Sequence, residues 1–323
     1  MKHAIILCLT GLSLLAVAAP AKKAAPRRAV AKPAAVVTKG LPETAFRRTP
    51  YVGAIAVDAQ TGRVLFERNA DQVARPASVT KLMTLLLCLE DMHAMKYEVT
   101  TRVTASVRCS QEKPSCVGLK PGQSMTVDDL LMSIMVKSAN DAAVLLAENS
   151  TAKNAGREIQ PGDLQAFVQR MNRKAEALGM VNTHYETPNG YPPRPGSKRP
   201  FDTSTARDLV KLAKAVLRYP EIFRYTKTKL TSVTDGAGNP LKMVNHNNIL
   251  VKDKQKILND RGESEVDGLK TGYIDAGGSS IVLTGQRNGK RAIVIVLGSQ
   301  TTKLRDASAR QLMVEALDKI AGK

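Results

Sequence analysis

The chain has 323 residues, 43% of them hydrophobic, which suits one large domain or two interlocked lobes. Its 48 lysines and arginines against 29 acidic residues give a formal net charge of +19. No nucleic-acid motif or aromatic-rich basic stripe accompanies this charge, so nucleic acid is not the expected partner. Either anionic cell-envelope polymers are the counter-charge, or the basic surface serves only solubility.

A run of small and aliphatic residues occupies positions 4–19, after a basic start. The run is shorter than the roughly 20 residues of a membrane span, and Ala16 and Ala18 form the A-x-A pattern that signal peptidases cleave. We therefore expect residues 1–18 to be a signal peptide and the protein to be exported, soluble and periplasmic. An uncleaved membrane anchor is the alternative.

Residues 19–48 have a different composition, in which proline and alanine alternate with eight basic residues against one acid, Glu43. Such a segment cannot bury enough apolar surface to offset the entropy lost on ordering, so we expect a disordered basic tether. The tether is the part of the chain that would contact anionic envelope polymers. Residues 49–323 are expected to form the folded domain.

Strands are predicted at both ends of this domain and helices in its middle. Residues 51–57 and 63–68 form one expected hairpin, and residues 278–299 form another around the two-residue turn Asn288-Gly289. Helices are expected from Ser78, from Thr126 as N-cap, from about Asn140, and over 163–178, 203–217 and 302–320, with loops at 150–162 and 192–200. The pattern predicts an α/β (α+β) fold whose two ends meet in one sheet, with a helical lobe at roughly 75–225 inserted between them.

Three cysteines follow the predicted leader. Cys109 and Cys116 bracket the polar loop SQEKPS, and an exported protein keeps its disulfides, so a bridge between them is expected to be possible. Cys88 falls on an apolar helix, where it is most simply a small buried hydrophobe.

Ser78 and Lys81 lie one helical turn apart at the start of an otherwise apolar segment. This spacing places both side chains on one face, about 5–6 Å apart at Cβ. Burial lowers the pKa of a lysine, and a neutral amine beside a hydroxyl can take its proton and make it a nucleophile. The pattern recurs at Ser110 and Ser150 in loop settings, and an N-cap serine followed by a solvent-reaching lysine is the structural alternative.

Two further motifs supply matching chemistry. Ser138 and Asn140 lie at a junction between helices, where a hydroxyl could relay a proton and an amide could hold a substrate carbonyl; an ordinary helix cap is the alternative. Lys270 and Thr271 precede the last hairpin and suit a carboxylate, while Gly272 leaves room for a substrate strand; a strand ending on a glycine turn is the alternative.

Together and in this order, the three motifs resemble the Ser-x-x-Lys, Ser-x-Asn and Lys-Thr-Gly set of penicillin-recognising serine enzymes. The resemblance runs from about 50 to 298 and points to the low-molecular-mass penicillin-binding proteins, the D-alanyl-D-alanine serine peptidases. The stretches that carry it are RPASVTKLMT, LKPGQSMTVDDLLMSIMVKSANDAA, MNRKAEALGMVNTHYETPNG, STARDLVKLAKAVL and VDGLKTGYIDAGG.

The resemblance implies a β-lactamase/transpeptidase-like fold, with a five-stranded, mainly antiparallel sheet flanked by helices. It implies that Ser78 is the acyl-enzyme nucleophile, Lys81 its base, and Ser138 with Asn140 the pair from the helical lobe. Ala139 departs from the family's more usual glycine.

The resemblance also implies that Lys270 and Thr271 bind the substrate carboxylate, with Gly272 beside them. The backbone N–H groups of Ser78 and Tyr273 would form the oxyanion hole. Peptidoglycan stem peptides would be the substrates and β-lactams covalent inhibitors, with no cofactor and no metal. His93, His184 and His246 show no ligand spacing, which argues against a metal hydrolase; His246 borders the cleft or, more simply, stabilises a loop.

Among related activities, a class A β-lactamase is disfavoured because no glutamate from Glu148 to Glu263 has asparagine four residues on. The chain stops at Lys323, directly after the last predicted helix, which resembles the shorter soluble D-alanyl-D-alanine endopeptidases that cut crosslinks. A carboxypeptidase that removes terminal D-alanine is the alternative. A non-catalytic wall-binding protein is a hypothesis of a different class.

Overall fold

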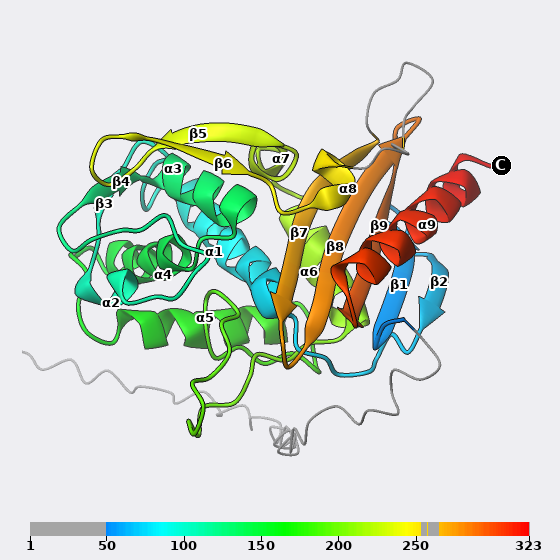
Figure 1. The fold of residues 1–323 in the computed structure, drawn as a ribbon, viewed down its shortest axis with the longest axis horizontal. Coiled ribbons are helices and arrows are strands. Elements are labelled where there is room, and N and C mark those ends of the chain that lie inside the picture. The colour runs from blue at the N-terminus through cyan, green and yellow to red at the C-terminus, as the bar shows by residue number, and fades with distance from the viewer. Residues whose placement is uncertain (1–49, 253–256, 258–264, 323) are drawn as a thin grey trace, which may run out of the picture. The chain divides into compact units, whose positions relative to one another are not determined.

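A computed structural model describes residues 50–252, 257 and 265–322 of the protein (Figure 1). The expected signal peptide and basic tether lie outside the described residues. The strands are β1 (Gly53–Asp58), β2 (Val64–Arg68), β3 (Arg102–Thr104), β4 (Ser124–Thr126), β5 (Leu230–Thr234), β6 (Pro240–Val244), β7 (Val266–Ile274), β8 (Gly278–Arg287) and β9 (Lys290–Ser299). The α-helices are α1 (Lys81–His93), α2 (Val107–Ser110), α3 (Val127–Met132), α4 (Asn140–Asn154), α5 (Asp163–Ala177), α6 (Ala206–Val216), α7 (Ile222–Thr226), α8 (Asn248–Val251) and α9 (Thr302–Ala321).

Five strands form the main sheet in the order β2-β1-β9-β8-β7, with every neighbouring pair antiparallel. Because β1 pairs with β9, the two ends of the domain meet in one sheet, as predicted. The turn between β8 and β9 is also as predicted: Asn288 and Gly289 adopt φ of +50° and +76°, the positive values that a two-residue hairpin turn of this kind requires.

Both faces of the sheet are covered, and β9 shows how the sequence achieves this. Its side chains alternate, so that Ile293 and Ile295 join the core shared with the helical lobe while Val294 and Val296 join the core under α9. Figure 1 shows α9 lying across one face of the sheet. A strand buried on both faces reads as an unbroken apolar run, which is why the segment AIVIVL carries no polar residue.

The helical lobe is built around α1, whose residues are buried on nearly all sides among α4, α5 and α6. The predicted cap of α3 is present, since Thr126 Oγ1 accepts from the backbone N–H of Asp129 at 3.1 Å. Two boundaries differ from the sequence prediction. Residues 77–80 form a tighter 3₁₀ turn, η2, so α1 begins at Lys81, and α4 continues to Asn154 because its inner face stays buried past residue 149.

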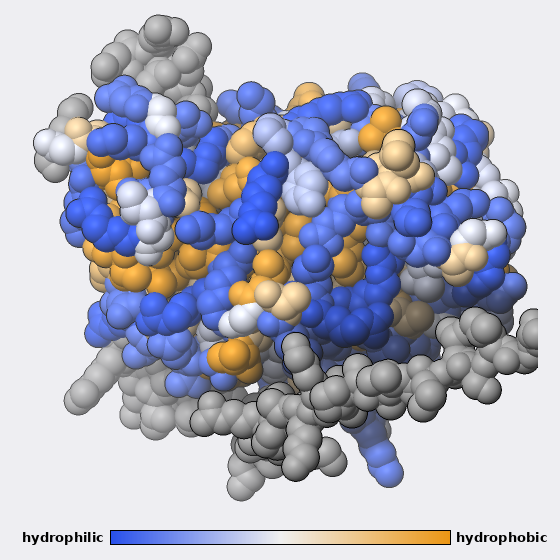
Figure 2. Space-filling view, turned by 180° about the vertical axis from the view of Figure 1, so that it is seen from behind, coloured by the Kyte–Doolittle hydropathy of each residue, from blue (hydrophilic) through white to orange (hydrophobic). Residues whose placement is uncertain are grey.

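Two small two-stranded sheets, β3–β4 and β5–β6, were not anticipated because their strands are short and mostly not buried. The second is a hairpin that connects α7 to α8 and lies along α3 in the helical lobe (Figure 1). Seen from behind, the surface is mainly hydrophilic, with separate apolar areas between the polar residues (Figure 2).

Candidate active site

Ser78 lies in η2, three residues before the first full turn of α1, and is half-buried. The turn contains Ala77 at φ +51°, in the left-handed region that residues other than glycine rarely adopt. Two glycines pack against it: a Cβ at Gly190 would lie 1.9 Å from the Ala77 carbonyl oxygen, and a Cβ at Gly272 would lie 2.6 Å from that of Pro76. Because no side chain fits at either position, the turn is held from two sides.

Lys81 is completely buried beside this serine. Its Nζ lies 2.9 Å from Ser78 Oγ, 2.7 Å from Asn140 Oδ1 and 2.7 Å from the carbonyl oxygen of Asn189. Burial lowers the pKa of Lys81 to about 7, and the negative charge of Glu112 opposes part of that decrease. A substantial fraction of the amine is therefore neutral near pH 7.

Asn140 is the first residue of α4, and polar contacts fix its orientation. Its Nδ2 donates to the carbonyl oxygen of Lys113 at 2.8 Å and its backbone N–H donates to that of Ser115 at 2.7 Å, while Oδ1 faces Lys81. One N–H of the amide has no acceptor among the described residues and is available to a substrate carbonyl. Ser138, two residues earlier, adopts φ +58° where the π-helical turn η3 (Ser133–Lys137) ends.

Lys270 is buried on β7, and its Nζ donates to Ser138 Oγ at 3.0 Å and to the Thr271 carbonyl oxygen at 2.9 Å. Burial, followed by the positive charges of Lys81 and Arg305, lowers the pKa of Lys270 well below its ordinary value. The structure thus brings residues of the three sequence motifs into contact with one another: Ser78 and Asn140 with Lys81, and Ser138 with Lys270.

Ser78, Ser138 and Asn140 line one cavity of about 490 Å³. Lys81 and Lys270 are buried behind this lining, each in contact with one of its serines. Thr271, Gly272 and Tyr273 form its wall along β7, and the exposed ring of Tyr273 lies at its rim with its hydroxyl donating to Asp275 at 2.7 Å. In the described part of the chain β7 pairs only with β8, so its other edge borders the cavity. A peptide could add to that edge as a further strand.

Sequence reasoning missed three contributors to this site. Asn189 and Gly190 lie in the stretch TPNG, which resembles the family sequence but carries no residue pattern that indicates a catalytic role. Arg305 lines the cavity from the first turn of α9, where it is 3% exposed. It is one basic residue in an ordinary helix start, so no sequence signal marks it.

His246 borders the cavity, and burial together with three nearby lysines lowers its pKa to about 4.

A larger groove of about 1150 Å³ continues from the catalytic cavity, and the two share Tyr191, Pro192, Ile274 and Asp275. Its walls come from α4, α5, the loop after α2 and the loop at 186–201. Side-chain amides of Gln111, Gln165 and Gln169 line it. The groove leaves the site at the Ile274 end of β7, away from Lys270.

The disulfide expected between Cys109 and Cys116 is not formed, and both are free thiols. Cys109 is buried in the core with its Sγ donating to the Ser106 carbonyl oxygen at 3.2 Å, and Cys116 donates to that of Lys113 at 3.2 Å. Each thiol thus donates to a carbonyl oxygen three residues before it in the chain. Cys88 is buried on α1, as predicted.

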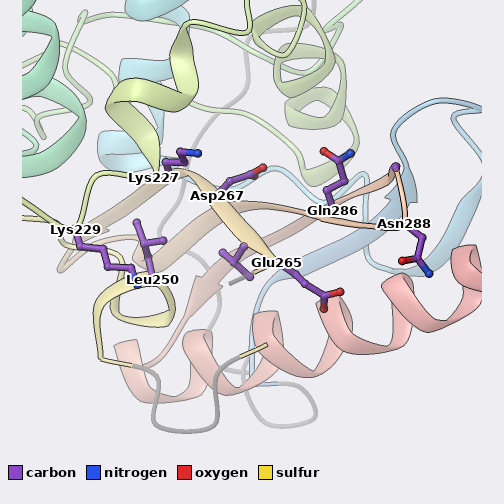
Figure 3. Close-up of a pocket in the computed structure, with 9 residues that line it drawn as sticks. Lys227, Lys229, Leu250, Glu265, Asp267, Gln286 and Asn288 are labelled. Atoms are coloured by element: carbon purple, nitrogen blue, oxygen red, sulfur yellow. The ribbon is translucent and has the colours of Figure 1, made fainter. Parts of the chain in front are cut away.

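A second cavity, of about 380 Å³, lies at the opposite end of β7 (Figure 3). The side chains of Glu265 and Asp267 point to opposite sides of the strand there. Glu265 accepts from Arg287 at 2.6 Å, and Asp267 accepts from Arg291 at 2.8 Å. Because both carboxylates are bound by arginines, neither is free to act as a general acid or base in this cavity.

Within the described residues, no three His, Cys, Asp or Glu side chains are grouped so that they could hold a metal ion. Nor does any described helix have the length and apolar character needed to cross a membrane.

The S11 peptidase profile, described as D-alanyl-D-alanine carboxypeptidase, matches residues 51–301. The chain belongs to the S11 peptidase family. Among relatives in this family, D-alanyl-D-alanine carboxypeptidase DacF of Bacillus subtilis is 30% identical over 260 residues, which cover 80% of this chain and 60% of the relative. The chain therefore spans only about 60% of the length of that S11 protein. A D-alanyl-D-alanine endopeptidase of Pseudomonas aeruginosa is 28% identical over 264 residues, covering 81% of this chain and 76% of the relative.

Solved structures of related S11-type proteins show the same architecture. Penicillin-binding protein D2 of Listeria monocytogenes in its ampicillin-bound form matches with a TM-score of 0.65 at 28% identity, covering 83% of this chain and 97% of that one. A Streptomyces K15 DD-transpeptidase variant matches with a TM-score of 0.69 at 26% identity, covering 83% and 98%. The predicted family and its transpeptidase-like fold with a five-stranded antiparallel sheet are confirmed.

Proposed function

We propose that the protein is a serine D-alanyl-D-alanine peptidase that works through an acyl-enzyme on Ser78. The observation that carries the proposal is the contact of 2.9 Å between Ser78 Oγ and Nζ of Lys81, an amine whose pKa burial lowers to about 7. A neutral amine has two N–H bonds and one lone pair. With the N–H bonds directed at Asn140 Oδ1 and the Asn189 carbonyl oxygen, the lone pair is left for the proton of Ser78.

The reaction then proceeds in two stages. Ser78 Oγ attacks the peptide carbonyl as its proton moves to Lys81, and the backbone N–H groups of Ser78 and Tyr273 stabilise the oxyanion. The carbonyl–nitrogen bond breaks as the proton held by Lys81 is relayed through Ser138, which Lys270 contacts at 3.0 Å, to the leaving amine, and Lys81 becomes neutral again. Lys81 then takes a proton from water as the water attacks the ester, and it returns this proton to Ser78 Oγ as the acyl–oxygen bond breaks.

Substrate recognition combines a carboxylate site with a strand edge. Thr271 and Arg305 line the cavity, and Lys270 is buried next to Thr271. These three residues would bind the terminal carboxylate, whose charge favours the protonated form of Lys270 that burial disfavours. The peptide would then run along the edge of β7 past Tyr273 and into the large groove.

We propose further that peptide crosslinks of peptidoglycan are the substrate, which makes the protein a D-alanyl-D-alanine endopeptidase. Support comes from the Pseudomonas aeruginosa relative of that name, which this chain matches over 76% of its length. The groove of about 1150 Å³ beside the site also suits a long peptide substrate.

A carboxypeptidase that removes terminal D-alanine is the second candidate. The family description and the Bacillus subtilis relative both carry that name. Either activity predicts that β-lactams acylate Ser78, as expected from the ampicillin-bound form of the Listeria monocytogenes relative. Either also requires export to the cell wall, where the basic tether would contact anionic polymers.

Digestion of defined muropeptides tests these proposals. Purified protein is incubated with crosslinked dimers and with uncrosslinked pentapeptide monomers, and the products are identified by mass spectrometry. We expect dimers to be converted to monomers. Loss of terminal D-alanine from monomers with dimers intact would favour the carboxypeptidase, and no difference between wild type and Ser78→Ala would overturn both candidates.

A further inference from the structure

The loop that follows α2 contacts the catalytic residues without contributing one of the three motifs. Its Lys113 carbonyl oxygen accepts from Asn140 Nδ2 at 2.8 Å, and Ser115 holds the backbone of Asn140. Glu112, in the same loop, accepts from Asn189 Nδ2 at 2.8 Å, while the Asn189 carbonyl oxygen accepts from Lys81 at 2.7 Å. Besides Ser78 Oγ, Lys81 Nζ contacts two oxygens, Asn140 Oδ1 and the carbonyl oxygen of Asn189. Asn140 and Asn189 are both hydrogen-bonded to this one loop.

Glu112 differs from the other acidic groups that face Lys81. These are Asp141, Asp202 and the thiol of Cys116, and Lys270 faces the amine with the opposite charge. Asp141 accepts from three backbone N–H groups at residues 117–119. Asp202 accepts from Thr80, Glu186 and Thr187. Burial raises the pKa of the Cys116 thiol to about 11, which keeps this thiol neutral. Among the described acids, Glu112 is the one bonded to a residue that itself contacts Nζ.

A guanidinium completes the arrangement. Arg108 Nη1 donates to Glu112 Oε1 at 2.6 Å, which leaves Oε2 for Asn189. The Glu112 side chain is 8% exposed and that of Arg108 is 48% exposed. The Glu112 carboxylate therefore bonds to the half-exposed Arg108 through one oxygen and to Asn189, whose carbonyl contacts Lys81, through the other.

We propose that Glu112 is a positioning residue for Lys81, which orients the Asn189 carbonyl through one hydrogen bond and places a negative charge beside the amine. This inference rests on the proposed function, because it assumes that Lys81 acts as the base. Two consequences follow. Loss of the charge makes the amine easier to deprotonate, and loss of the hydrogen bond loosens the geometry in which it acts.

The test is the pH dependence of Ser78 acylation by a fluorescent penicillin, measured in single turnovers from pH 5.5 to 9. In Glu112→Gln the midpoint of the acidic limb should fall by about half a unit to one unit, and the plateau rate should fall roughly three- to tenfold. In Arg108→Gln the carboxylate remains but loses its counter-charge, so the midpoint should rise. Opposite shifts from adjacent residues are not expected of a merely structural loop.

Two controls make the result decisive. Glu265→Gln removes another buried, arginine-paired carboxylate, about 24 Å along β7 from Gly272, and should leave the midpoint where it is in wild type. If Glu112→Gln does not fold, Arg108→Gln decides alone, since its side chain is half exposed. Midpoints that stay at the wild-type value in both variants, or move in the same direction, overturn the inference while the proposed function stands; a wild type that penicillin does not acylate overturns the function itself.

Discussion

Strand β7 carries ionisable residues at both ends, and the two ends treat them differently. Asp267 and the preceding Glu265 are each bound by an arginine, and these pairs leave neither carboxylate free. Lys270, three residues further on, is buried, and among the described residues its Nζ contacts only oxygens of Ser138 and Thr271. Lys81 is buried too, and in the same described part of the chain its Nζ contacts no carboxylate. A buried charge that is paired can be tolerated by the fold, whereas a buried lysine without a counter-ion lowers the stability of the folded state and is typical of functional sites.

The strongest way to break this comparison is to remove the nucleophile. Ser78→Ala should abolish covalent labelling by penicillin, a loss of about a thousandfold or more in rate, because among the described residues Ser78 carries the one hydroxyl that contacts Lys81. Ser110→Ala is the matched control, since Ser110, the last residue of α2, and Lys113 repeat the same spacing but do not line the cavity of Ser78. Labelling is measured by gel fluorescence, and equal signals from wild type and Ser78→Ala would contradict the assignment.

Replacing Lys81 by an uncharged side chain of similar length separates catalysis from stability. Lys81→Met should reduce acylation by roughly a thousandfold, because the base is lost, and should leave the protein as stable as wild type or more stable. Glu265→Gln should do the reverse: acylation unchanged, but stability lowered by about 2–3 kcal/mol, because Arg287 is left without its partner. Stopped-flow acylation and urea unfolding measure the two effects.

Lys270→Gln should affect binding more than chemistry. For peptides that end in a free carboxylate, kcat/KM should fall by roughly 30- to 100-fold, because the cation that pairs with the carboxylate is gone. The same peptides with an amidated C-terminus should lose far less. A uniform loss for both series would place Lys270 in the chemical step instead.

Taken per pH unit, the smallest effect on acylation is the change with pH. Acylation should rise about tenfold per unit below pH 7 and level off above it, as Lys81 loses its proton. The folded-state pKa of Lys81 lies below that of the unfolded chain, so the unfolded state binds more protons between about pH 7 and 10.5, and stability should rise with pH across that window by up to about 1.4 kcal/mol per unit. Lys81→Met should show a flatter profile in the same unfolding experiments.

The parts of the site that the sequence predicted are those with a local signature. Ser78 and Lys81 stand out because a lysine interrupts an apolar helix, and the turn at Asn288-Gly289 because its backbone requires those residues. Arg305 could not be found, since its position depends on how α9 crosses the sheet. The possible bridge between Cys109 and Cys116 rested on their spacing around a polar loop and on expected export, neither of which says which way each thiol points.

The free edge of β7 has a consequence for selectivity. A substrate that adds to a sheet edge is gripped through its main chain, which every peptide shares. Such a grip tolerates many side chains but requires an extended run of backbone, so the conformation of the peptide, more than the identity of its side chains, would decide whether it binds along β7.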